Sequence, residues 1–151
     1  MGKRHDAREW AVQFLFQRDF NSGELDTALQ DFWEDQEREP SDRMKAFTED
    51  LVRGVEENRD EIDVLLKRCA EHWDVHRMGA VDRNVMRVAL YEMLHCPDIP
   101  PVVSINEAVD IAKALSSFES ARFVNGILDR ALKEVDRPQR DAQKPGDREK
   151  D

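Results

Sequence analysis

Four side chains near the start of the chain recur every fourth residue and could together bind nucleic acid. They are Arg4, Arg8, Val12 and Phe16, and this spacing places them along one face of a helix. Arginine can hold phosphate groups and an exposed aromatic ring can stack on a base, a combination that proteins use to bind single-stranded RNA. The alternative is a solvated helix edge that ends in one more core phenylalanine. From the pattern alone, that alternative is favoured.

A second group of residues has the chemistry of a metal site. Cys69, His72 and His76 are spaced as on one helical face, and His95 and Cys96 lie elsewhere in the chain. A structural zinc site needs four converging cysteine or histidine ligands. The two groups lack the spacing of a zinc finger, so we predict no metal site. We expect Cys69 to be a small core residue and the histidines to lie on the surface.

Motifs of known catalytic sites are absent from the sequence. It contains no glycine-rich phosphate loop, no HExxH and no nucleophile elbow. Carboxylates are abundant, but in so charged a chain they are mostly parts of solvated helix faces. We therefore expect no catalytic residues and no cofactor.

The negative charge of the chain is concentrated in one stretch. The net charge is −10, and residues 24–63 contain 15 acidic and 5 basic residues, which leaves 18 of each kind elsewhere. At the N-terminus, Lys3, Arg4, Arg8 and Arg18 outnumber the acidic residues around them. Because local charge governs binding more than total charge does, the acidic total does not exclude nucleic acid as a ligand.

Cysteine usage and hydropathy indicate the cellular compartment. The two cysteines form no CxxC pair, and the N-terminus has no apolar segment followed by a cleavage signal. The longest apolar run, "AVQFLF", is far shorter than the roughly 20 residues of a membrane span. We expect a soluble protein of the reducing cytoplasm, with no membrane association.

The elements that must position these residues are all predicted to be helices. Apolar spacing indicates about seven helices, and no alternating run of β-branched residues indicates a strand. The expected fold is therefore all-α. We place a subdomain boundary before the glycine-containing "HRMGAVDR", with residues 1–76 as the N-terminal subdomain and 77–136 as the C-terminal one. The polar residues 137–151 should form a disordered tail.

Two local signals predict how particular helices begin and pack. In "IPPVVSINEAVDIAK", an extended Pro-Pro connector precedes Ser104 and Glu107, which have the spacing of a capping box. In "FVNGILD", Asn125 and Gly126 lie within a helical apolar pattern although glycine costs roughly 1 kcal/mol there relative to alanine. We predict a continuous helix in which Gly126 allows a neighbouring helix backbone to approach closely.

Three strings together resemble the NusB family of transcription antitermination factors. They are "AREWAVQFLFQ", "VDRNVMRVALYEML", and "IPPVVSINEAVDIAK" followed by "RFVNGILD". The similarity covers about Lys3 to Leu132, and the acidic stretch between Glu24 and Asp42 matches poorly. The resemblance implies two small helical bundles in one domain, no catalysis, and binding of boxA-like single-stranded RNA from ribosomal RNA leaders. It also implies a small-subunit ribosomal protein acting as NusE as partner, in an antitermination complex with RNA polymerase.

The resemblance also implies where RNA would bind. It favours RNA contact for the N-terminal helix, where Phe16 matches a position that is commonly tyrosine. His5 and Asp6 stand where the family is usually more basic. Asp82 and Glu119 match positions near the RNA, with helix capping and interaction with the helix dipole as the alternative for both. The candidate RNA-binding residues are Lys3, Arg4, Arg8, Phe16, Asp82, Glu119, Arg122 and Phe123.

Two other functions stay open on the sequence alone. The chain could be a protein–protein interaction module, or a self-associating homodimer, with weak RNA binding; the acidic stretch and the residues His5 and Asp6 favour this. It could also be the NusB-like domain that precedes an RNA methyltransferase in some proteins. Against the second, the chain ends in a polar tail and has no glycine-rich cofactor loop.

Overall fold

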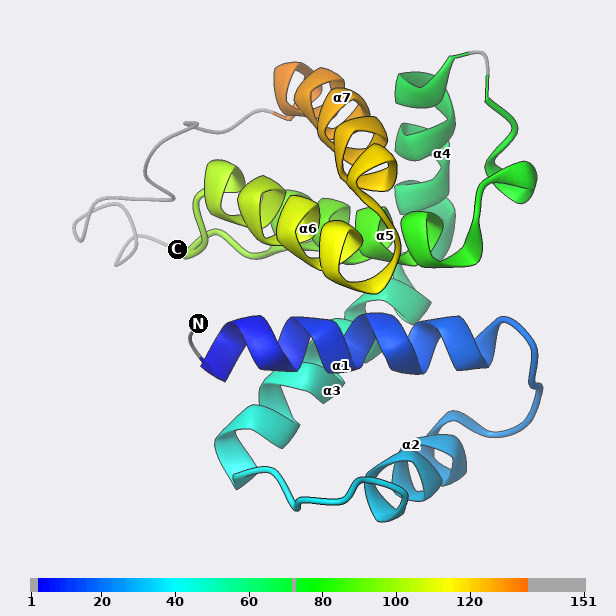
Figure 1. The fold of residues 1–151 in the computed structure, drawn as a ribbon, viewed down its shortest axis with the longest axis vertical. Coiled ribbons are helices and arrows are strands. Elements are labelled where there is room, and N and C mark those ends of the chain that lie inside the picture. The colour runs from blue at the N-terminus through cyan, green and yellow to red at the C-terminus, as the bar shows by residue number, and fades with distance from the viewer. Residues whose placement is uncertain (1–2, 72, 136–151) are drawn as a thin grey trace.

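The computed structural model describes residues 3–71 and 73–135, and within these ranges it contains helices and no strand. The helices are α1 (Lys3–Arg18), α2 (Leu25–Glu34), α3 (Asp42–Glu57), α4 (Arg59–Ala70), the short 3-10 helix η1 (Val75–Arg77), α5 (Ala80–His95), α6 (Pro101–Leu115) and α7 (Phe118–Glu134) (Figure 1). The prediction of an all-α fold with about seven helices is confirmed. The predicted tail, residues 137–151, lies outside the described residues. No helix in the described part is both long and apolar enough to cross a bilayer.

Helix α5 joins the two halves of the molecule. It packs against α4, α6 and α7 on one side and against α1 and α3 on the other, and Figure 1 shows α1 to α3 in one half and α4 to α7 in the other. Every residue of α5 from Asn84 to Leu90 is buried, as its apolar girth requires. Helix α4 packs on α5 and α7. The predicted subdomain division at residue 76 stays a prediction.

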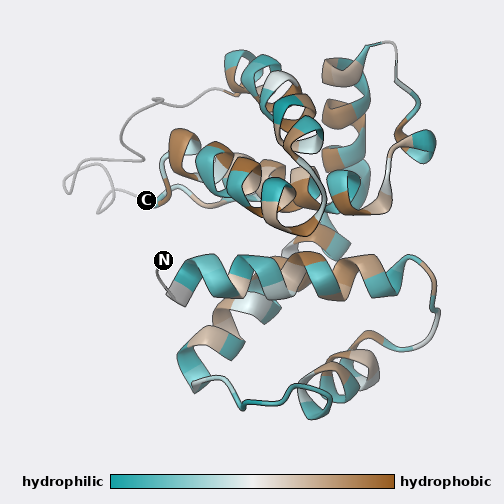
Figure 2. Cartoon of the chain, in the orientation of Figure 1, coloured by the Kyte–Doolittle hydropathy of each residue, from teal (hydrophilic) through white to brown (hydrophobic). Residues whose placement is uncertain are grey.

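Helix α2 has few apolar residues and depends on aromatic contacts with α1. Phe32 meets Phe14 edge to face with 5.5 Å between ring centroids, and Trp33 meets Trp10 in the same way at 5.6 Å. Figure 2 shows hydrophobic and hydrophilic residues alternating along α1 and α2, the pattern of amphipathic helices. Edge-to-face pairs of this kind stabilise beyond their buried area, which compensates for the small apolar face of α2.

The two halves approach each other closely at a glycine of α3. A Cβ atom on Gly54 would overlap the ring of Tyr91 in α5, with 2.6 Å to the Cε2 atom. A Cβ on Gly126 would meet no atom within 4 Å. The predicted close approach at Gly126 is therefore wrong, although α7 does run through Asn125 and Gly126 without interruption, as predicted.

Helix α6 begins earlier than the capping-box signal predicts. It starts at Pro101, and proline suits the first turn because it lacks the N–H that would be unpaired there. Ser104 is consequently inside the helix and buried, where its hydroxyl donates to Glu92 Oε1 at 2.6 Å. Glu107 accepts a hydrogen bond from Arg8. The predicted capping box is wrong because both side chains bind a buried charge cluster.

Candidate nucleic-acid interface

The N-terminal half of α1 presents no continuous exposed stripe. Arg8 is only 5% exposed and Val12 is buried. The Arg8 guanidinium donates from Nε to Glu92 Oε2 at 2.7 Å and from Nη1 to Glu107 Oε1 at 3.2 Å. This edge of α1 therefore faces α5 and α6, and the prediction of one exposed stripe from Arg4 to Phe16 is wrong.

The charged groups around Arg8 form a paired cluster between the two halves. Glu92 is fully buried and also accepts from the Ser104 hydroxyl. His5 Nδ1 lies 2.8 Å from Glu107 Oε1. Because a buried charge is tolerated only when it is paired and hydrogen-bonded, Arg8 and Glu92 require each other. In this structure Arg8 positions α1 against α5 and α6.

Arg4 stays at the surface, at the N-terminal end of α1. Its guanidinium lies over the ring of Phe47 in α3, 4.9 Å from the centroid, in a hollow also lined by Arg43 and Asp50. Lys3 is the first residue of α1, and its side chain lies outside the described part. Among the described side chains of α1, Arg4 is therefore the exposed basic group at this end, about 18 Å along the helix from Phe16 at 1.5 Å per residue.

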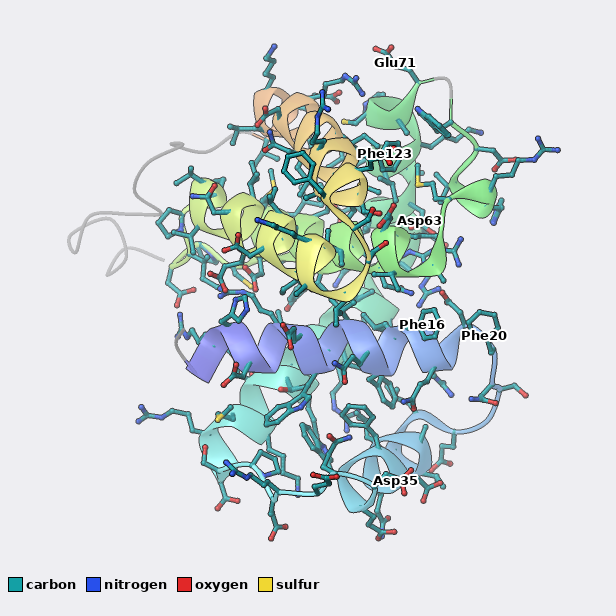
Figure 3. All side chains as sticks on the ribbon, in the orientation of Figure 1. Phe16, Phe20, Asp35, Asp63, Glu71 and Phe123 are labelled. Carbon is teal, nitrogen blue, oxygen red and sulfur yellow. The ribbon has the colours of Figure 1, made fainter. Side chains whose placement is uncertain are left out.

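Two phenylalanine rings are exposed at the other end of α1. Phe16 is 36% exposed and Phe20, just after the helix, is 69% exposed. Their ring centroids are 5.2 Å apart and their planes are inclined by 63°, and Figure 3 shows both beyond the packed part of α1. Sequence reasoning missed Phe20. Phe20 continues the four-residue spacing of Arg4 and Phe16 but lies beyond the end of α1, so that spacing does not predict its exposure.

Asp19 connects this aromatic pair to the start of α5. Its Oδ2 atom accepts from Arg83 Nη2 at 3.0 Å and from Asn84 Nδ2 at 2.8 Å. Arg83 also donates to the carbonyl oxygens of Val75 and Met78. The end of α1, the segment around η1 and the first turn of α5 are thus held together by one guanidinium.

Asp82 lies in the first turn of α5 and contacts the start of α7. Its Oδ2 atom accepts from the Ser120 hydroxyl at 3.2 Å, whereas Oδ1 is buried and has no hydrogen-bond partner among the described residues. Burial raises the pKa of the Asp82 carboxyl, and the Ser120 hydrogen bond partly opposes that shift.

The predicted capping alternative does not hold for the acids at these helix starts. The N-cap of α5 is Gly79 and the N-cap of α7 is Ser117, whose hydroxyl accepts from the backbone N–H of Ser120. Asp82 and Glu119 lie inside the first turns, where a negative charge still interacts favourably with the helix dipole. Glu119 is exposed and so can also meet a ligand.

The remaining predicted residues lie on the next turn of α7. Arg122 is exposed, and Phe123 is partly buried against the ring of Trp73, with 5.1 Å between centroids. Figure 3 labels Phe123 between α7 and α4. Trp73 is 56% exposed and lies beyond the end of α4. Sequence reasoning missed Trp73 as part of this surface.

The structure brings most of the candidate residues to three neighbouring helix ends. Phe16 lies near the end of α1, and Asp82 lies in the first turn of α5. Three further candidate residues lie in the first turns of α7. Hydrogen bonds of Asp19 and Ser120 connect these helix ends. Arg8 is removed from this surface by burial and Arg4 by distance. The α7 residues are Glu119, Arg122 and Phe123.

The cysteine and histidine group has ordinary structural roles in the described part of the chain. Cys69 is buried, as predicted, and burial together with nearby Glu134 raises the pKa of its thiol to about 11. A thiol that stays protonated is a poor metal ligand. His76 and His95 are exposed, as predicted, and His72 lies outside the described residues. Among the described residues, no three potential ligands are grouped to hold a metal ion.

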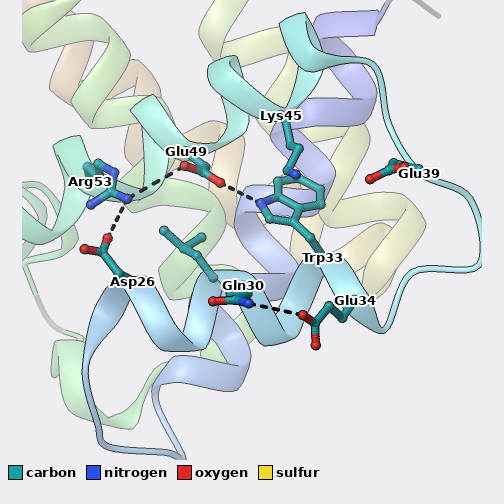
Figure 4. A pocket seen from close by; sticks show the side chains of 9 residues that line it. Asp26, Gln30, Trp33, Glu34, Glu39, Lys45, Glu49 and Arg53 are labelled. Carbon is teal, nitrogen blue, oxygen red and sulfur yellow. Dashed lines mark hydrogen bonds and ion pairs between the residues drawn. The ribbon is translucent and has the colours of Figure 1, made fainter.

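A hollow between α2 and α3 lies within the acidic stretch (Figure 4). Its charged groups bind one another: Arg53 Nη2 donates to Asp26 Oδ1 at 2.7 Å, and Trp33 Nε1 donates to Glu49 Oε2 at the same distance. The Lys45 ammonium lies over the Trp33 ring. These contacts join α2 to α3.

Comparison with known proteins gives consistent matches along the chain. The family model described as the NusB family matches residues 5–133. The transcription antitermination protein NusB of Desulforapulum autotrophicum is 46% identical over 143 residues, covering 93% of this chain and 100% of its own. The protein of the same name from Myxococcus xanthus is 42% identical, covering 91% of this chain and 100% of its own.

Solved structures show the same arrangement of helices. The structure of T. maritima NusB is 39% identical, with a TM-score of 0.78 over 87% of this chain and 91% of that one. A structure of the antitermination factors NusB and NusE in complex with double-stranded RNA has a TM-score of 0.79 at 23% identity, covering 89% of this chain and 98% of that one. The latter likeness concerns the fold alone. Since the family model spans most of the chain and relatives above 40% identity match it along nearly their full lengths, the chain belongs to the NusB family.

Proposed function

We propose that this protein is an RNA-binding transcription antitermination factor. It recognises boxA-like single-stranded RNA of ribosomal RNA leaders together with a small-subunit ribosomal protein acting as NusE, within a complex with RNA polymerase in the cytoplasm. The names of its relatives support this, as does the complex of NusB and NusE with RNA in a protein of the same fold. The observation that carries the proposal is the exposed aromatic surface formed where α1 ends and where α5 and α7 begin.

Each group on this surface has a role in recognition. The Phe16 ring offers a stacking face, which binds any base without selecting its sequence. The Asp82 carboxylate can accept a hydrogen bond from a base amino group, and Arg122 can pair with a phosphate. Binding of this kind makes and breaks no covalent bond, so the proposed function requires no catalytic residue and no cofactor.

The negative charge of residues 24–63 gives a reason why the protein partner should assist RNA binding. A chain of net charge −10 repels RNA at long range, whereas a basic ribosomal protein would be attracted to residues 24–63 and associate faster. Once bound, the partner would offset the negative field near the RNA. RNA binding and partner binding should therefore be cooperative, with a coupling of typically 1–3 kcal/mol that is the same in both directions.

Titration calorimetry tests this proposal directly. A synthetic boxA RNA is titrated into the free chain and into the preformed heterodimer, with a scrambled RNA of equal composition as the control. The heterodimer should bind boxA RNA at least about fivefold more tightly, which is the lower end of the coupling range, and RNA should tighten the protein pair by the same factor. Indistinguishable affinities in the two titrations would refute the cooperative mechanism.

Single substitutions test the RNA surface. Phe16→Ala should cost about 1–3 kcal/mol of RNA binding, the range for one lost aromatic–base stack, while Phe16→Tyr should retain affinity because it keeps the ring. Arg4→Ala should reduce the slope of log affinity against log salt by about 0.7 if Arg4 contacts a phosphate. Lys67→Ala, an exposed cation on α4, is the matched control and should leave the slope unchanged.

The alternative of a self-associating module with weak RNA binding gives different results in the same assays. It predicts a homodimer by sedimentation at micromolar concentration and no preference for boxA RNA over the scrambled control. The concentration of negative charge in residues 24–63 is the observation that favours it. A monomer that prefers boxA RNA would exclude it.

A further inference from the structure

Phe20 is the most exposed large apolar side chain among the residues that the structure describes. Its exposed fraction is 69%. Among the described aromatic rings, only the ring of Phe16 packs against it, edge to face. A phenyl ring left in water gains nothing for the fold, because apolar burial is the dominant stabilising effect. Phe20 therefore contributes little to the core and is available to a ligand.

The turn that presents Phe20 is fixed on both sides. The backbone N–H of Phe20 donates to the Gln17 carbonyl at 3.1 Å, and Arg18 Nη1 donates to the Gly23 carbonyl at 2.9 Å. Gly23 has φ of 128°, a conformation that favours glycine. Asp19 is bound by two side chains of α5. A ring held on such a turn loses little conformational entropy when a ligand binds.

The surroundings of Phe20 favour a nucleic acid over a protein as the ligand. Its sequence neighbours Arg18, Asp19, Asn21 and Ser22 are all polar, so Phe16 and Phe20 form a small apolar island. Protein interfaces use contiguous apolar patches of several hundred Å², whereas single-stranded RNA needs only ring-sized platforms beside polar groups. Through Asp19 the island is joined to Arg83, the residue after Asp82. The island is thus continuous with the proposed RNA surface.

We propose that Phe20 is a second stacking residue, so that Phe16 and Phe20 each receive one base of the same RNA strand. This inference rests on the proposed function and adds a residue and a geometry to it. Planes inclined by 63° cannot both stack on one base, and two bases lying on them cannot remain stacked on each other. The RNA strand is therefore splayed between the two nucleotides that these rings bind.

Equilibrium binding of a fluorescent boxA RNA to the free chain and to the heterodimer tests the role of the ring. Phe20→Ala should weaken binding on the order of 5- to 150-fold, the equivalent of 1–3 kcal/mol per lost stack at 1.4 kcal/mol per tenfold. Phe20→Trp should bind as wild type. Phe20→Leu, which stays apolar but cannot stack, should be nearly as weak as Phe20→Ala. Val64→Ala, an exposed apolar position on α4, should have no effect.

Abasic RNAs test whether two bases are involved. Removing the base that lies on Phe20 should cost as much as Phe20→Ala, and combining the two changes should cost little more, because they remove one interaction. The same cycle with Phe16→Ala should identify a different nucleotide. Coupling of both rings to a single nucleotide would overturn the two-base arrangement.

The outcomes separate this inference from the proposed function. If Phe16→Ala weakens RNA binding but Phe20→Ala and Phe20→Leu bind as wild type, the second stacking residue is refuted and the proposed function stands. If wild type binds no boxA RNA in either form, both are refuted. If Phe20→Ala weakens the protein pair in the absence of RNA, the ring belongs to a protein interface and the inference is wrong. The melting temperature of Phe20→Ala should match wild type, since the ring is mostly exposed.

Discussion

The two ends of α1 differ in the kinds of side chain that they bury and expose, and each end departs from the usual preference of those side chains for the surface or the interior. At the N-terminal end the chain buries a cation, Arg8, beside the fully buried Glu92. At the C-terminal end it exposes two aromatic rings, Phe16 and Phe20. The difference depends on what lies opposite. Helices α5 and α6 cover the first end and supply the counter-charge, whereas the rings of the second end lie beyond that contact.

This contrast separates the residues that hold the fold from those available to a ligand. We call the contacts of α1 and α3 with α5 and α6 the seam; Arg8, Glu92, Gly54 and Tyr91 belong to it. Changes in the seam should lower the free energy of unfolding. Changes on the exposed surface of α1, α5 and α7 should alter RNA affinity and leave the fold nearly unaffected.

The largest effect on stability should come from Arg8→Ala. It leaves Glu92 as a buried charge without its cation, and breaking a buried pair in this way typically costs 3–5 kcal/mol. Urea denaturation measures the loss in the free energy of unfolding. Arg4→Ala, at an exposed position of the same helix, should change it by no more than about 0.5 kcal/mol.

A double variant sharpens the test of the buried pair. Arg8→Met combined with Glu92→Met leaves no fully buried charge without its partner, because the partly exposed Glu107 keeps its contact with His5. Replacing a whole buried pair by apolar residues is often close to neutral. The double variant should therefore be more stable than Arg8→Ala alone. A loss below about 1 kcal/mol for Arg8→Ala would mean that the N-terminal end of α1 is not fixed by this cluster, and the contrast between the two ends would fail.

The second effect concerns the glycine of the seam. Gly54→Ala places a methyl group into the ring of Tyr91, and overpacking of this kind costs typically 1–3 kcal/mol. Thermal and urea unfolding should both show the loss. Tyr91→Leu in the same chain should recover part of it, because the clash is with the ring. A Gly54→Ala variant as stable as wild type would show that the two halves do not approach closely there.

The third effect has the opposite sign and serves as the matched control. Gly126→Ala adds a methyl group where no atom lies within 4 Å, in the interior of α7. Helix propensity alone should then raise the free energy of unfolding by up to about 1 kcal/mol. A lower melting temperature for Gly126→Ala would restore the close approach that the sequence suggested at this position.

The periodicity of the sequence predicted features that depend on a single segment. It predicted an all-α fold of about seven helices and the core position of Cys69 correctly, because an apolar face is local information. It could not identify Glu92 as the partner of Arg8, since the two are 84 residues apart and nothing in either segment specifies the other. For the same reason Ser104 and Glu107 looked like a capping box, and Gly126 looked like a contact glycine in place of Gly54.

The candidate site was predicted in part, and mostly through family resemblance. Phe16, Asp82, Glu119 and Phe123, which the resemblance suggested as RNA-binding residues, lie on neighbouring helix ends, and whether they bind RNA stays a prediction. Phe20 and Trp73 were missed because both lie just outside a helix. Periodicity says nothing about exposure at such positions, where the chain turns and the next element decides what is covered.

The smallest effect should come from Asp82, which is partly buried in the first turn of α5, beside the start of α7. Burial raises the pKa of its carboxyl in the folded protein, so ionisation costs the fold some stability. That cost is absent below the unfolded pKa of about 3.9 and grows as pH rises through the raised folded pKa. Wild type should therefore lose stability relative to Asp82→Asn between acidic and neutral pH, as measured by urea denaturation of both proteins at each pH.

RNA binding should respond to the same substitution in the opposite direction. If the carboxylate accepts a hydrogen bond from a base amino group, Asp82→Asn makes the free protein slightly more stable at pH 7 but weakens its complex with boxA RNA. If Asp82 lies near the RNA without such a contact, removing one negative charge reduces repulsion and tightens binding. Ser120→Ala is the control, because it removes the hydroxyl that binds Asp82 Oδ2 without changing charge. A variant Asp82→Asn that is more stable and also binds RNA more tightly would assign Asp82 to the packing of α5 against α7 and remove it from the RNA surface.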